Sequence, residues 1–96
     1  MLVLWPLLCL AAVPRASAAA LVKRRNLCSN AAQQAYQDHW SHPAAHITPL
    51  GYTNHYDVAH DRCYLLVTYR KDKSTWFDAS DVQTGRLAAH IRVSPP

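Results

Sequence analysis

Two histidines, two aspartates and a cysteine lie within ten positions of the chain, in the segment NHYDVAHDRC at residues 54–63. Side chains of these types bind zinc or copper where three or four of them converge. The segment HWSHPAAH adds three imidazoles, so the candidate metal ligands are His39, His42, His46, His55 and His60. Against a metal site, the spacing matches no zinc motif, and Pro43 prevents the H-x-x-H pair from sharing one helical face. A hairpin explains the segment better, with Asp57 and Asp61 bonding nearby backbone amides to set its turn.

The sequence offers little else for catalysis. A nucleophile needs a base and an orienting group beside it, and no serine lies in a nucleophile-elbow context. The chain has six aspartates and no glutamate, and the five aspartates from residue 57 onward fit turns and strand ends, so paired-carboxylate chemistry is disfavoured. A domain of this size has little room for a large pocket. We therefore predict a protein that is not an enzyme and uses no cofactor.

The first twenty residues predict export. An apolar run over residues 2–13 is followed by Pro14-Arg15 and then by small residues, which is the layout of a secretory signal with its cleavage site. The apolar run is shorter than the roughly 20 residues that a permanent membrane span needs. We expect residues 1–20 to be a signal peptide and residues 21–96 one small domain. The mature protein should be periplasmic or secreted, and not membrane-spanning.

Removal of the signal would take Cys9 with it and leave Cys28 and Cys63. An even number of cysteines in an oxidising compartment predicts one disulfide. Closing a loop of this length would stabilise the fold by about 3 to 4 kcal/mol. The alternative, a reactive thiol pair, would favour closer spacing or a strongly basic environment.

The charge balance narrows the class of partner. Without Arg15, nine Lys and Arg residues against six Asp give a formal charge of +3 with neutral histidines. Such a modest excess suits anionic envelope surfaces or acidic partners, but it lacks the clustered basic character of nucleic-acid-binding proteins. Nucleic acid is therefore not expected as a partner.

Helical periodicity precedes strand periodicity along the chain. A helix is predicted from Asn26 or Ser29, which can cap it, to near Trp40, where the approach to Pro43 stops it. Its inner face would carry Cys28, Ala32, Ala35, Tyr36 and His39. Strands are predicted at residues 52–57, 62–70, 74–80 and 86–93, where side chains alternate between two faces with a period of two residues. Turn segments separate these strands.

These elements predict an α+β fold, with one N-terminal helix packed on a four-stranded antiparallel β meander. Cys63, Leu65, Val67 and Tyr69 should face the helix, and the disulfide would clip helix to sheet. An aromatic and basic face would then lie on the wet side, suited to carbohydrate, anionic envelope polymers or a protein partner. Equally, cross-strand aromatic and arginine packing could merely shield the sheet. The residues proposed for this face are Tyr64, Arg70, Trp76, Arg86, His90 and Arg92.

The chain also resembles a group of small exported bacterial proteins of uncharacterised function. The resemblance rests on the helix-borne Cys28, on YTNHY followed by a short loop and Cys63, and on Asp78-Ala79 with the later Gly85-Arg86. It implies an envelope or secreted location and no particular activity. Our leading hypothesis is a non-catalytic binding module of the bacterial envelope, whose partner is an envelope protein or an anionic envelope polymer. The alternative is a periplasmic zinc- or copper-binding protein that uses the five histidines.

Overall fold

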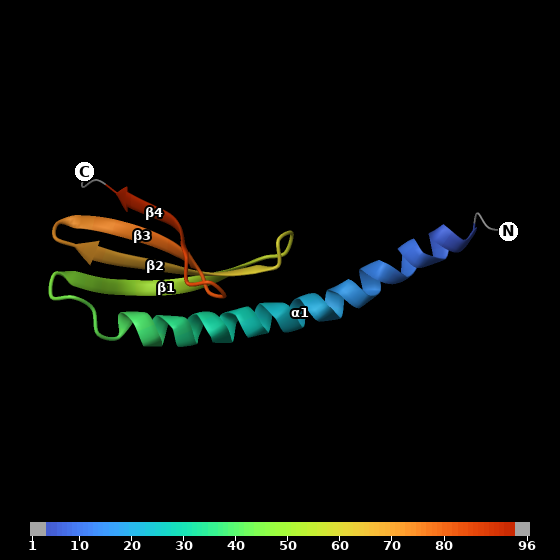
Figure 1. The fold of residues 1–96 in the computed structure, drawn as a ribbon, viewed down its shortest axis with the longest axis horizontal. Coiled ribbons are helices and arrows are strands. Elements are labelled where there is room, and N and C mark those ends of the chain that lie inside the picture. The colour runs from blue at the N-terminus through green and yellow to red at the C-terminus, as the bar shows by residue number, and fades with distance from the viewer. Residues whose placement is uncertain (1–3, 94–96) are drawn as a thin grey trace.

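The computed structural model describes the backbone of residues 4–93 and the side chains of residues 18–93. One long helix lies along one face of an antiparallel sheet with strand order β1-β2-β3-β4 (Figure 1). The predicted α+β meander is confirmed. The elements are α1 (Leu4–Trp40), β1 (Ile47–Asp57), β2 (Arg62–Lys71), β3 (Ser74–Asp81) and β4 (Leu87–Val93).

Helix α1 ends at Trp40 as predicted, but it begins at Leu4 and not near residue 26. The segment ASAAALVKRR at residues 16–25 is rich in good helix formers and contains no glycine or proline, so nothing in it interrupts the helix. The part of α1 that packs on the core runs from Cys28 to Trp40. That part would remain after removal of residues 1–20, which stays a prediction.

The three predicted turns join the strands. The first two contain Asp61 and Asp72, whose positive φ angles of 50° and 57° are tolerated by aspartate more readily than by most residues. The third closes on Gly85, whose φ of 73° suits glycine. In this turn the Asp81 carboxylate accepts a hydrogen bond from the Gln83 amide at 2.8 Å. Short polar turns of this kind allow only the sequential antiparallel order.

Strand β1 is longer than predicted, because residues 47–51 belong to the sheet and not to a connector. Ile47 packs against the core, which gives this end of the strand an apolar anchor. Pro49 is compatible with the strand because β1 is an edge strand, where a missing amide need not break a ladder bond. The pairing with β2 shifts between Pro49 and Gly51, so a bulge absorbs the irregularity.

The core lies between α1 and β2. Ala32, Leu65, Val67 and Tyr69 are buried, as expected, and partly buried side chains of α1, β1 and β3 surround them. On the helix, Trp40 takes the last inward position in place of the predicted His39, which is exposed; the Trp40 and Tyr69 ring centroids lie 5.0 Å apart. The Cys28–Cys63 disulfide is confirmed, with an S–S distance of 2.07 Å and Cα atoms 5.4 Å apart.

The helix covers only part of the sheet. Its backbone lies over β1 and β2 and only its side chains reach the near part of β3, while β4 lies at the opposite edge of the sheet (Figure 1). The sheet therefore has three kinds of surface. These are a covered core over β1 and β2, an uncovered strip on the helix side of β3 and β4, and an open face on the opposite side.

Candidate functional site

Three of the six predicted binding residues gather on the uncovered strip. Trp76 of β3 lies opposite Arg92 of β4 in the sheet, and His90 lies two pairs further along, opposite Asp78. The His90 ring stacks on the Trp76 indole with centroids 4.4 Å apart and planes 20° apart. The Arg92 guanidinium lies 5.9 Å from the centroid of the same indole, within cation–π range. The three side chains form a continuous stack of cation, indole and imidazole.

Asp78 and Tyr69 fix this stack to the core. The Asp78 carboxylate lies 2.5 Å from His90 Nδ1, and the Tyr69 hydroxyl donates to both Asp78 oxygens at 3.2 Å. Burial, together with the negative charge of Asp78, raises the pKa of Tyr69 to about 12, so this hydroxyl remains a donor at neutral pH. We call the five residues Tyr69, Trp76, Asp78, His90 and Arg92 the Trp76 cluster.

The electrostatics of the Trp76 cluster favour an anion. The Asp78 charge is engaged by two partners on its own face, whereas Arg92 is exposed and forms no ion pair within the described part of the chain. Lys71 pairs with Ser74, which lies two residues before Trp76 on β3. Residues two apart on a strand share a face, so Lys71 adds a second cation on the Trp76 side of the sheet. An aromatic stack beside exposed cations suits an anionic ligand with an apolar or sugar-ring surface.

The other three predicted residues lie on the open face, so the six do not form one surface. Tyr64 pairs with Asp81, and Arg70 pairs with Thr75. Both β2 residues alternate with the buried residues of that strand, so they point to the face opposite the helix. Arg86 lines a hollow of about 320 Å³ with Tyr64 and Arg62. The prediction treated the strip beside Trp76 as part of the wet face, whereas the register brings Trp76 opposite the buried Tyr69.

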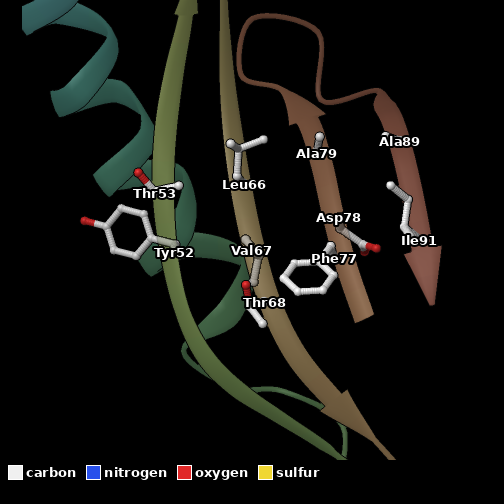
Figure 2. Close-up of a pocket in the computed structure, with 10 residues that line it drawn as sticks. All are labelled: Tyr52, Thr53, Leu66, Val67, Thr68, Phe77, Asp78, Ala79, Ala89 and Ile91. Carbon is white, nitrogen blue, oxygen red and sulfur yellow. The ribbon is translucent and has the colours of Figure 1, made fainter. Parts of the chain in front are cut away.

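The open face is more apolar than predicted. Leu66, Phe77 and Ile91 project from neighbouring strands around the small Ala79 and Ala89, and together they line a hollow of about 440 Å³ (Figure 2). Phe77 is 42% exposed and Ile91 57% exposed. The sequence of β4 indicates an apolar side of this strand, because Ala89, Ile91 and Val93 all lie on it. The alternation does not predict which of the two sides of the sheet the helix covers.

The histidine-rich segment forms a hairpin turn. Asp57 accepts a hydrogen bond from His60 Nδ1 at 2.8 Å and bonds the backbone amides of Ala59 and His60, and these contacts lower the pKa of its carboxyl group. The Tyr56 hydroxyl donates to Asp61, and Arg24 of α1 lies 3.8 Å from the same carboxylate. Asp57 thus bonds backbone amides of the turn as expected, whereas Asp61 bonds side chains instead.

The five candidate metal ligands are not brought together. Within residues 18–93, the structure contains no group of three or more histidine, cysteine, aspartate or glutamate side chains placed to hold a metal ion. The positions are separated by the fold, since His39 lies at the end of α1, His42 and His46 in the following connector, and His55 on the open face.

Comparison of the chain with protein-family models, with curated proteins and with solved structures finds no match in any of the three. Among the residues that the structure describes, no helix is both long enough and apolar enough to cross a membrane.

Proposed function

We propose that the protein is a small, exported, non-catalytic binding module of the bacterial envelope that recognises an anionic polymer through the Trp76 cluster. The observation that carries the proposal is the Arg92–Trp76–His90 stack on a strip of sheet that α1 leaves uncovered. The half-exposed His90 ring, backed by the Trp76 indole, offers an aromatic surface for a sugar ring, and Arg92 offers a charge-assisted hydrogen bond to a carboxylate or phosphate.

The disulfide supports the export part of the proposal. Structural disulfides persist in oxidising compartments such as the periplasm or the medium and are rare in the reducing cytosol. The Cys28–Cys63 bond is buried, with both residues at most 5% exposed, so it anchors the helix and is a poor candidate for a redox site. The Trp76 cluster lies on strands tethered by this anchor, which preorganises it for binding.

The test is binding of polygalacturonate, an acidic polysaccharide, measured by calorimetry with neutral dextran as the reference ligand. We expect Arg92→Ala to weaken polygalacturonate binding about tenfold, because it removes a charge-assisted hydrogen bond. Arg70→Ala is the matched control, since it removes the same charge from the opposite face and should leave affinity unchanged. Equal affinity of the Arg92→Ala variant and the native protein would overturn the proposal. So would equal binding of dextran.

A further inference from the structure

The open face carries two adjoining hollows of different chemistry. The first is the apolar hollow of about 440 Å³ around Leu66, Phe77 and Ile91. The second is the hollow of about 320 Å³ around Tyr64, Arg62 and Arg86. Tyr64, which lines the second hollow, and Leu66, which lines the first, project from the same side of β2 and lie about 7 Å apart along the strand. We call the two neighbouring hollows together the groove, whose length is apolar and whose end is basic.

The apolar length has the shape of a trough. Ala79 and Ala89 lie opposite one another in the sheet and leave its floor low, while the larger Leu66, Phe77 and Ile91 form its sides (Figure 2). Phe77 and Ile91 remain about half exposed, so the face retains apolar area that burial against a ligand would stabilise. The volume falls within the range of small-molecule sites.

The basic end is organised by local bonds. Asp81 Oδ2 lies 3.3 Å from Arg62, and Asp81 Oδ1 caps the turn that leads into β4. The single acidic group lining this hollow is therefore engaged on both oxygens. Arg86 is exposed and forms no ion pair with any residue in the part of the chain that the structure describes. The end of the groove thus presents a free guanidinium beside the Tyr64 ring.

From this arrangement we infer that the open face binds a free single-chain anionic amphiphile, with its alkyl chain in the trough and its carboxylate on Arg86. Charge complementarity sets the direction. Arg70 at the opposite end of the face lines neither hollow, so the head group lies at the Arg86 end. This inference goes beyond the proposed polymer site, which lies on the other side of the sheet and shares none of these arginines.

The probe is dodecanoate, titrated into the purified protein by calorimetry below the concentration at which it forms micelles. We expect saturable binding with one site, and weaker binding of the cationic dodecyltrimethylammonium. Arg86→Gln should weaken dodecanoate about tenfold through loss of a charge-assisted hydrogen bond, and Arg70→Gln should leave it unchanged. Ala89→Trp should abolish binding by filling the trough. Arg86 is exposed, so its variant keeps the test valid where the Ala89 variant fails to fold.

Several outcomes would overturn the inference. One is an affinity that is the same in the Arg86→Gln and native proteins, and another is a loss with Arg70→Gln in place of Arg86→Gln. Binding to anionic vesicles without binding of monomeric dodecanoate would assign the face to a membrane surface. Self-association that excludes dodecanoate and is abolished by Ala89→Trp would assign it to a second copy of the chain. Polygalacturonate binding by the Arg86→Gln variant separates this result from the polymer proposal, because that site should be unaffected.

Discussion

The two faces of the sheet have comparable apolar rows but very different burial. On the helix side, Leu65 and Val67 are each 2% exposed, whereas Phe77 and Ile91 on the open side are 42% and 57% exposed. The sequence alternation that produces these rows is present in β2 and in β4 alike. The helix, linked to β2 by the Cys28–Cys63 disulfide, covers the row of β2 that forms the core. The remaining row and the uncovered strip are left free to bind.

Removal of the Cys28–Cys63 disulfide should have the largest effect, because this bond holds the helix on the face that is buried. We expect the double variant Cys28→Ser and Cys63→Ser to lose about 3 to 4 kcal/mol of unfolding free energy, because the unfolded chain regains the entropy of a loop closed across 35 residues. Urea denaturation, followed by far-ultraviolet circular dichroism, measures the loss. Native protein treated with a reductant is the control and should approach the variant. A loss below about 1 kcal/mol would contradict a clip that determines which face is the core.

Adjacent leucines on β2 sharpen the comparison at single-residue scale. Leu65 faces the helix and Leu66 faces the open hollow. Leu65→Ala should cost about 3 kcal/mol, because it leaves a cavity in the core. Leu66→Ala should cost about 1 kcal/mol, because Leu66 is only partly removed from water. Urea denaturation of both variants measures the difference. Equal losses would mean that the open face is covered in solution.

Much of the fold could be predicted because it follows from local patterns. The alternation from Cys63 to Tyr69 gave the buried row of β2, and the approach to Pro43 gave the end of α1. The early start of β1 was missed, because Pro49 reads as a strand breaker unless its strand is known to be an edge.

The candidate site was only half predictable, for a physical reason. Trp76, His90 and Arg92 were expected to be together, and they are. Their separation from Tyr64 and Arg86 depends on which face the helix covers and how far it reaches across the sheet. That coverage arises from contacts between segments distant in sequence, which the alternation of a single strand does not contain. The groove on the open face was missed for the same reason.

The smallest effect concerns the link between core and cluster through Tyr69. Its pKa is raised in the folded protein to about 12, from an ordinary value of 10, mainly by burial and then by Asp78. A raised pKa stabilises the fold below pH 10, and this contribution is lost as pH rises from about 10 through 12. Urea midpoints across this range should therefore fall more steeply for the native protein than for Tyr69→Phe. Tyr64→Phe, on the open face, is the control and should follow the native protein. Parallel curves for the native and Tyr69→Phe proteins would mean that Tyr69 titrates normally and does not tie the cluster to the core.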